Sequence, residues 1–211
     1  MMTEFTQEAL SLALQRALAT AESQFNELNA LDAATGDGDH GTAIVATLKA
    51  AVAAASAPAD LSTALSNIAM EIMSATGGST SSLNGAFYMG MSMAAPANAL
   101  GPVEVVKMYE SGLEMLQSQT SAKVGDKTMM DAMIPAVEAM SATMASNPSA
   151  TLRDLFDAAA KAAKEGAEKT ADYVAKFGRA KNLGERSKGS RDAGATSLAL
   201  IFQAFADVFA Q

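Results

Sequence analysis

Residues 4–30 read EFTQEALSLALQRALATAESQFNELNA, and this stretch decides the fold class that the sequence predicts. Its apolar residues, among them Phe5, Leu12 and Leu28, recur at the spacing of an amphipathic α-helix. Alanine, leucine and methionine are strong helix formers and dominate the rest of the chain. The alternation of β-branched residues that is typical of strands is nearly missing. The sequence therefore predicts an all-α fold.

Seven further helices are predicted after the first, and most of the loops between them are short. They span residues 42–56, 60–75, 83–95, 102–117, 128–145, 151–176 and 195–209, with an irregularity expected at Gly166. Eight helices joined in this way pack in antiparallel, up-and-down order, which gives a bundle or a helical barrel. Since no linker is long enough to separate two domains, residues 1–211 are expected to form a single domain.

The composition limits the classes of function that the chain can serve. Of its 211 residues 49% are hydrophobic, and its formal net charge of −8 disfavours binding to nucleic acid. The absence of cysteine excludes disulfide bonds, zinc thiolates and thiol catalysis. The acidic N-terminus does not resemble a signal peptide, and no apolar run is long enough for a membrane span. We therefore expect a cytoplasmic protein without nucleic-acid or membrane partners.

Three aspartates, Asp32, Asp37 and Asp39, lie in the stretch Leu31-Asp-Ala-Ala-Thr-Gly-Asp-Gly-Asp-His-Gly-Thr42, with two glycines between them. Their spacing does not place the carboxylates on one helix face, but a glycine-rich turn can bring them to one point. Three like charges at one point repel each other unless a cation lies among them. The stretch therefore predicts a site for a hard cation, above all Mg²⁺, and a solvated acidic turn is the alternative.

Two other motifs that this stretch partly matches do not fit it. The spacing Gly36-x-Gly38-x-x-Gly41 is that of a dinucleotide-binding turn, but such a turn follows a strand, and a helix is predicted here. A calcium loop that starts at Asp37 needs glutamate at its twelfth position, where this chain has Leu48. Neither motif therefore replaces the magnesium interpretation.

Four loops contain residues suited to binding, and all four are odd-numbered connections between the predicted helices. They span residues 31–42, 76–82, 118–128 and 178–194. In an up-and-down bundle alternate loops lie at the same end, so these four are expected to meet there.

The loops differ in the chemistry that they offer. Gly77-Gly-Ser-Thr80 has backbone N–H groups and hydroxyls suited to cradling a phosphate, although a plain small-residue turn has the same composition. Gly125-Asp-Lys-Thr128 matches only part of a phosphate-binding loop. The last loop concentrates basic residues in an acidic chain: Arg179, Lys181, Arg186, Lys188 and Arg191. Carboxylates, phosphate-binding loops and basic groups together indicate a magnesium–nucleotide site.

Four ordered motifs give the chain a resemblance to a known family. They are Leu31-Asp-x3-Gly-Asp-Gly-Asp-His-Gly41, Gly77-Gly-Ser-Thr80, Gly125-Asp-Lys-Thr-Met129, and Gly178-Arg-Ala-x-x-Leu-Gly-Glu-Arg-Ser187 followed by Asp192-x-Gly-Ala-Thr-Ser197. In these motifs the chain resembles, over essentially its whole length, the nucleotide-binding L subunit of dihydroxyacetone kinase. This subunit is equivalent to the C-terminal domain of single-chain dihydroxyacetone kinases. The resemblance implies a barrel of eight antiparallel helices with the nucleotide at one end.

The resemblance also implies a set of site residues. Asp32, Asp37 and Asp39 would hold two Mg²⁺ ions that bridge to the phosphates of ADP or ATP. The nucleotide contacts would be His40, Gly41, Thr42, Ala43, Ser79, Thr80, Met129, Arg179, Asp192, Ala193 and Gly194. Arg179 would also be the catalytic residue, because a guanidinium can neutralise the charge that develops on a transferred phosphoryl group.

The family's K partner binds the ketone covalently through a histidine, and this chain has only His40. The resemblance therefore implies a kinase subunit that acts with a separate, ketose-binding K-type subunit. Two phosphoryl donors stay open: free ATP, or a phosphotransferase-system protein that rephosphorylates bound ADP. Departures from the family pattern leave the ketose open as well, with erythrulose as one candidate; they include Ser81, Ser82, Lys181, Asn182, Ser190 and Ala193.

Two other functions stay open at this point. One is a non-catalytic, nucleotide-binding regulatory module that has lost its partner through these departures. The other is a plain helical bundle whose acidic turn binds Ca²⁺ structurally. Co-purified nucleotide would exclude the plain bundle, and turnover with a K-type partner and a ketose would exclude the regulatory module.

Overall fold

The computed structural model describes residues 2–75, 79–96 and 98–210, and the secondary structure within these ranges is helical apart from two very short strands. The helices are α1 (Gln7–Ser23), α2 (Phe25–Ala33), α3 (His40–Ser56), α4 (Leu61–Ala75), α5 (Ser79–Met93), α6 (Pro102–Gln117), α7 (Met130–Ser146), α8 (Leu152–Lys169) and α9 (Ala193–Phe209). The strands are β1 (Phe5–Thr6) and β2 (Ala99–Leu100), and two 3₁₀ helices span Thr170–Asp172 and Ala180–Ser187.

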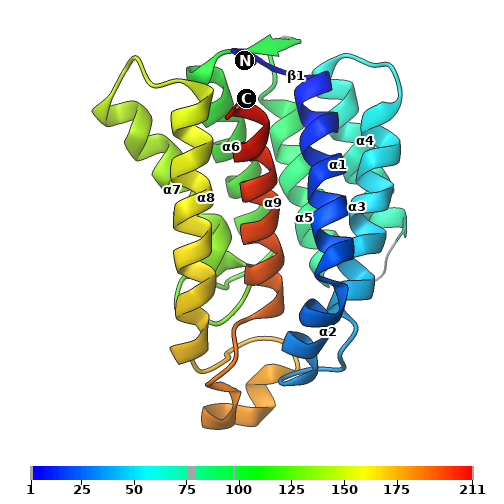
Figure 1. Cartoon of the computed structure of the whole chain (residues 1–211), viewed down its shortest axis with the longest axis vertical. Coiled ribbons are helices and arrows are strands. Elements are labelled where there is room, and N and C mark those ends of the chain that lie inside the picture. Colours follow the sequence, from blue (N-terminus) through cyan, green and yellow to red (C-terminus); the bar gives the residue numbers. More distant parts are fainter. Residues whose placement is uncertain (1, 76–78, 97, 211) are drawn as a thin grey trace.

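Eight long helices form a closed ring, and the short helix α2 lies at one end of it (Figure 1). Along the chain each long helix packs against the next one, from α1 and α3 through to α8 and α9. The last helix, α9, also packs against α1, so the ring closes into a barrel. Neighbouring helices run in opposite directions, and both chain termini lie at the end opposite α2. The predicted barrel of eight antiparallel helices is confirmed.

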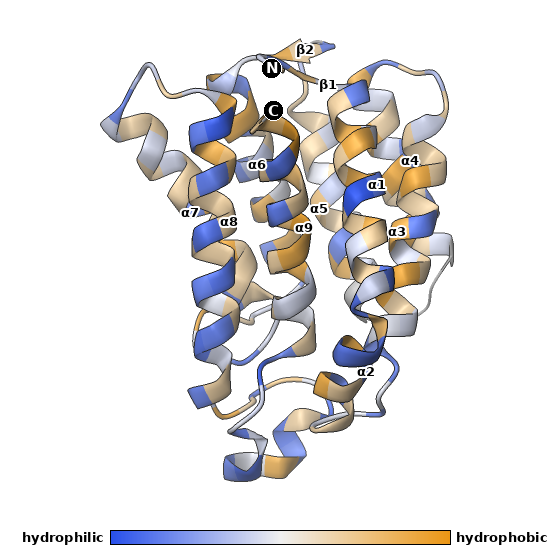
Figure 2. Cartoon of the chain, in the orientation of Figure 1, coloured by the Kyte–Doolittle hydropathy of each residue, from blue (hydrophilic) through white to orange (hydrophobic). Residues whose placement is uncertain are grey.

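Amphipathic faces explain why these helices assemble, because each one buries an apolar stripe against its neighbours. Figure 2 shows this most clearly on α8, whose hydrophilic residues lie on the outside of the barrel. This helix begins with a capping box, in which Thr151 Oγ1 accepts from Asp154 N and the Asp154 carboxylate accepts from Thr151 N. In the part of the chain that the structure describes, no helix combines the length and the apolarity needed to cross a membrane.

The end of the barrel opposite α2 is closed by aromatic packing around Phe5. This side chain is fully buried, and its ring stacks on Phe156, Phe205 and Phe209 at centroid distances of 6.1, 6.2 and 6.2 Å. Phe5 lies in β1, which pairs antiparallel with β2 in the register Phe5 to Leu100. Helix α1 follows, with Thr6 Oγ1 accepting a hydrogen bond from Ala9 N as its N-cap.

Several predicted helix boundaries were wrong. The first predicted helix, 4–30, begins only at Gln7 and is divided at Gln24 into α1 and α2, without a glycine or proline to mark the division. Helix α5 already begins at Ser79, so residues 79–82 belong to a helix rather than to the predicted loop. The long helix predicted to reach residue 176 ends at Lys169.

The irregularity expected at Gly166 is also absent, because α8 runs through this residue without a break. Gly166 is buried against α7, and a Cβ atom built on it would collide with the backbone carbonyl of Asp131. The glycine therefore serves the close approach of two helices.

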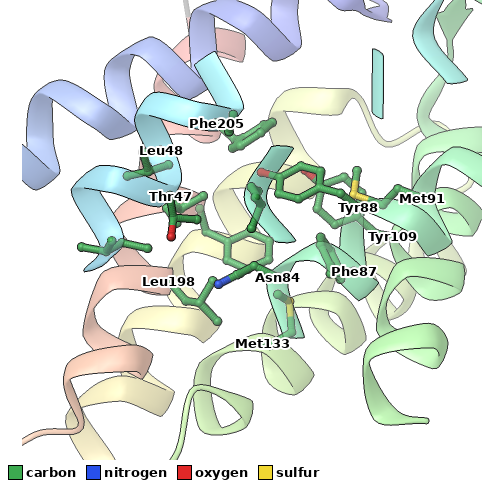
Figure 3. Close-up of a pocket in the computed structure, with 15 residues that line it drawn as sticks. Thr47, Leu48, Asn84, Phe87, Tyr88, Met91, Tyr109, Met133, Leu198 and Phe205 are labelled. Carbon is green, nitrogen blue, oxygen red and sulfur yellow. The ribbon is translucent and has the colours of Figure 1, made fainter. Parts of the chain in front are cut away.

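A small cavity remains inside the barrel, lined by residues of α3 to α7 and α9 (Figure 3). Its volume of about 30 Å³ is enough for a water molecule, and most of its lining is apolar. Polar groups reach it from Thr47, Asn84, Tyr88 and Tyr109. Burial raises the pKa of both tyrosines, so their phenols stay neutral at physiological pH. The interior of the barrel around this cavity is thus mostly apolar.

Candidate functional site

Three carboxylates come together at the α2 end of the barrel. One oxygen atom each of Asp32, Asp37 and Asp39 lies within 4.8 Å of the other two. Asp32 lies near the end of α2 and is half-buried, whereas Asp37 and Asp39 lie in the following turn and are exposed. The convergence predicted from the glycine-rich spacing is therefore present in the structure.

The side chain of Asp32 shapes the turn that carries the other two aspartates. Its Oδ2 accepts hydrogen bonds from Gly38 N at 2.8 Å and from Asp39 N at 3.1 Å. The backbone of Gly38 has a φ of +79°, a left-handed conformation that glycine adopts without steric cost. Asp32 thus has two roles, since it stabilises the backbone of the turn and also contributes a carboxylate to the cluster. The first role distinguishes it from Asp37 and Asp39.

The ligand set of this cluster fits a hard cation. All three side chains offer oxygen atoms, which Mg²⁺ and Ca²⁺ prefer, and two of the three are exposed to incoming ligands. Part of the negative charge is balanced by Arg179, whose Nη1 forms an ion pair with Asp37 Oδ2. The structure therefore places Arg179, the residue predicted to be catalytic, directly beside the carboxylate cluster.

Helix α3 begins at the carboxylate cluster with the predicted contact residues His40 to Ala43. His40 is buried, and its Nε2 lies 2.9 Å from Ser197 Oγ on α9. Burial lowers the pKa of His40, although the carboxylates of Asp32 and Asp39 act in the opposite direction. The imidazole ring of His40 is consequently neutral at pH 7.

The next residues of α3 continue this surface. Gly41 N donates to Asn29 Oδ1 at 2.7 Å, which ties the start of α3 to α2. Thr42 is exposed and Ala43 is half-buried, so both lie close to the surface at the beginning of the helix. Asn29 had not been predicted as a site residue, and no motif in the sequence singles it out.

The starts of α7 and α9 meet beside this region. Met129 is the N-cap residue of α7 and is buried. A Cβ atom built on Gly194 would lie 3.3 Å from Met129 Cβ, so the first turn of α9 touches Met129. Asp192 caps α9, with its Oδ2 accepting from Ala195 N at 2.7 Å. Three of the four predicted loops therefore converge at one end of the barrel.

The fourth predicted loop cannot be placed in the same way. Gly77 and the rest of residues 76–78 lie outside the part of the chain that the structure describes. Ser79 and Thr80 stand in the first turn of α5, and their side chains also lie outside the described part. Their proposed contact with a nucleotide stays a prediction.

Burial raises the pKa of Asp192 to about 6, and the carboxylate of Asp131 acts in the same direction. Between pH 4 and pH 6 the native state therefore holds a proton that the unfolded state has already released. Asp192 should lower the free energy of unfolding as the pH rises through this window, by up to about 3 kcal/mol. Compared with wild type, an Asp192→Asn variant should gain relative stability between pH 4 and pH 7.5 in urea denaturation.

The control for this prediction is Asp207→Asn, an exposed position near the other end of α9. Its stability difference from wild type should be nearly the same at both pH values. A stability difference between Asp192→Asn and wild type that does not change with pH would contradict the raised pKa.

Comparison with known proteins places these motifs in a family. A family model described as the DAK2 domain matches residues 34–207. The ADP-binding subunit DhaL of PEP-dependent dihydroxyacetone kinase 1 from Listeria innocua is 36% identical over 180 residues, which cover 84% of each chain. The corresponding DhaL subunit of Escherichia coli is 34% identical over 190 residues, which cover 89% of each chain.

A solved structure agrees with this assignment. The crystal structure of the dihydroxyacetone kinase from C. freundii in complex with AMP-PNP and Mg²⁺ superposes with a TM-score of 0.69 and 28% sequence identity. The match covers 98% of this chain and 35% of that chain, so the similarity concerns one part of a longer kinase. By sequence and by fold, the chain belongs to the DAK2 domain family.

Proposed function

We propose that this chain is the magnesium–nucleotide-binding, phosphoryl-transfer subunit of a kinase for dihydroxyacetone or a related small ketose. The observation that carries this proposal is the cluster of Asp32, Asp37 and Asp39 with the Arg179 guanidinium paired to it. Carboxylates for a metal and a guanidinium for phosphate charge are the parts that phosphoryl transfer requires. Two relatives are named ADP-binding subunits, and a similar crystal structure contains AMP-PNP and Mg²⁺.

In this proposal the residues at the α2 end have different roles in binding the metal and the nucleotide. Asp32, Asp37 and Asp39 hold two Mg²⁺ ions, which when bound neutralise charge on the phosphate oxygens. Arg179 adds a guanidinium that can donate to the same oxygens. The nucleotide would contact residues at the starts of α3, α5, α7 and α9, namely His40, Gly41, Thr42, Ala43, Ser79, Thr80, Met129, Asp192, Ala193 and Gly194.

Helix starts suit this task because their first N–H groups lack partners within the helix and carry partial positive charge. Helices α3 and α9 both begin here, joined by the contact of His40 with Ser197. An anionic ligand at this end would thus meet two helix N-termini and the Arg179 guanidinium, although the chain as a whole is acidic.

The ketose belongs on a separate K-type subunit. The only histidine of the chain is buried and hydrogen-bonded, so it is not available to hold a ketone covalently. The matches cover 84% and 89% of two proteins that are named as DhaL subunits of dihydroxyacetone kinases. Both of these relatives are named PEP-dependent, which favours a phosphotransferase-system protein over free ATP as the phosphoryl donor.

Loss of one metal ligand should weaken nucleotide binding without unfolding the barrel. Asp37→Asn and Asp39→Asn are the suitable variants, because Asp32 also supports the backbone of the turn. Each should lower the affinity for Mg-ADP by about tenfold or more, as one charged ligand contributes on the order of 1.5–3 kcal/mol. Isothermal titration calorimetry in the presence of Mg²⁺ measures this effect.

Asp207→Asn is the matched control, since it removes one exposed carboxylate near the opposite end of α9.

Mg-ADP should also raise the melting temperature of the wild type, and EDTA should cancel the increase, because a ligand that binds only the native state stabilises it. Unchanged Mg-ADP affinity in both Asp37→Asn and Asp39→Asn would refute the proposed metal site.

A further inference from the structure

Lys127 is a buried cation in an unusual backbone conformation. Only 3% of the residue is exposed, and its φ of +59° is the one left-handed value among the described non-glycine residues. Both features are unfavourable by themselves: burial penalises the ammonium charge, and residues with a Cβ atom rarely adopt this φ. Such a residue persists only where the surrounding contacts hold it in place.

The ammonium group of Lys127 joins two distant points of the chain. Its Nζ donates to Thr170 O and to Ser190 O, at 2.5 Å in each case. Burial lowers the pKa of Lys127, and the carboxylates of Asp192, Asp131 and Asp172 act in the opposite direction. Two of the three N–H groups of the Lys127 ammonium are therefore engaged within the protein.

The two carbonyls that accept from Lys127 flank residues 171–189, which we call the basic segment. Further hydrogen bonds join the two ends of this segment, and we call this junction its neck. Gly189 N donates to Ala171 O at 2.8 Å, and Asp192 N donates to Thr170 Oγ1 at 2.8 Å. Figure 1 shows the segment, in orange, at the α2 end of the barrel. Its two ends are thus held together, and Lys127 fixes both of them to the start of α7.

The basic segment carries Arg179 to the carboxylate cluster. Arg179 pairs with Asp37, but 68% of its side chain is exposed, so this contact alone positions it weakly. One more link joins the segment to the loop of Lys127, since Lys176 N donates to Asp126 O at 3.1 Å and Lys176 Nζ to Asp126 Oδ1 at 2.6 Å. Where Arg179 can reach therefore depends on how firmly the neck is held.

We infer that Lys127 is a positioning residue for Arg179: it holds both ends of the basic segment and thereby keeps the guanidinium beside Asp32, Asp37 and Asp39. The role of Lys127 in the reaction rests on the proposed kinase function. The role of Lys127 in holding the basic segment does not depend on that function, so the two roles can be tested separately.

The first test is hydrogen–deuterium exchange of the ligand-free protein. In Lys127→Met the amides of Gly189 and Asp192, which close the neck, and those of residues 173–188 should exchange roughly tenfold faster or more. Amides of α3 to α6 should keep their protection. Lys123→Met is the matched control, because it removes an exposed lysine from the same loop.

Exchange in the basic segment that is as slow in Lys127→Met as in wild type would overturn the inference. If Lys127→Met does not fold, Lys127→Gly takes its place. Glycine accepts the left-handed φ, so that variant removes the ammonium group and relieves the backbone strain at the same time.

The second test is a double-mutant cycle on ketose phosphorylation by the chain together with a K-type subunit, assayed once with a phosphotransferase-system phosphoryl donor and once with ATP. Lys127→Met should lower kcat roughly tenfold or more. In an Arg179→Ala background the same substitution should have almost no further effect, because the group that it positions is gone. An equal loss of kcat in both backgrounds would overturn the positioning role. If the wild-type assembly phosphorylates no ketose with either donor, the proposed function fails, and the exchange experiment alone decides whether Lys127 holds the segment.

Discussion

Replacement of Arg179 with alanine should lower ketose phosphorylation by the assembled kinase roughly 10²-fold or more. The guanidinium lies beside Asp37 at the carboxylate cluster, where a transferred phosphoryl group would develop charge. Removal of one preorganised charge-stabilising donor typically costs this much in rate. The measurement is kcat at saturating ketose and phosphoryl donor in the presence of the K-type subunit, with a phosphotransferase-system protein and with ATP as donors in parallel.

The fold should tolerate this substitution, because the Arg179 side chain is 68% exposed and an exposed ion pair contributes little to stability. Circular dichroism should therefore show unchanged helical content. Arg179→Lys should retain part of the rate, since lysine keeps the charge but not the planar, forked donor geometry.

Arg153→Ala is the control for Arg179→Ala. Arg153 lies in the first turn of α8, near the opposite end of the barrel, and forms an exposed ion pair with Asp157. Its loss should leave kcat unchanged. A kcat for Arg179→Ala within twofold of wild type would show that the catalytic role proposed for Arg179 is wrong.

The purified chain alone should phosphorylate no ketose, even with ATP and Mg²⁺ present, and should gain activity when a K-type subunit and a phosphotransferase-system phosphoryl donor are added. This is the largest effect that we expect, because the substrate site itself would be missing. The only histidine, His40, is buried and contacts Ser197, and the chain has no cysteine for another covalent route. Phosphoryl transfer also depends mainly on positioning, which requires both subunits.

Calorimetric titration of the same preparation with Mg-ADP provides the internal control, since it shows that the isolated chain is folded and able to bind. Ketose phosphorylation is then followed with dihydroxyacetone and with erythrulose, in the presence and absence of the K-type subunit. Appreciable turnover without that subunit would place the substrate site within these 211 residues and contradict the proposed division of labour.

Local sequence predicted the carboxylate cluster because the signal lies within eight residues. Asp32, Asp37 and Asp39 are held by a turn whose hydrogen bonds run from Gly38 N and Asp39 N to Asp32 itself. Glycine at position 38 meets the left-handed backbone that this turn needs.

Helix boundaries were less predictable where tertiary contacts decide them. The division between α1 and α2 at Gln24 has no glycine or proline to announce it. Conversely, Gly166 suggested an irregularity, although its actual role is to let α8 approach the backbone of α7 at Asp131. A glycine reads the same in a sequence whether it breaks a helix or allows two helices to touch.

The sequence by itself determined the helical class, the order of the helices and the acidic turn, since apolar spacing and glycine position act over a few residues. Only the tertiary structure decided that α9 closes the barrel against α1, that Arg179 meets Asp37, and that Lys127 joins Thr170 to Ser190. These pairs lie far apart in the chain. Their contacts depend on the register in which eight helices pack, and no local pattern specifies that register.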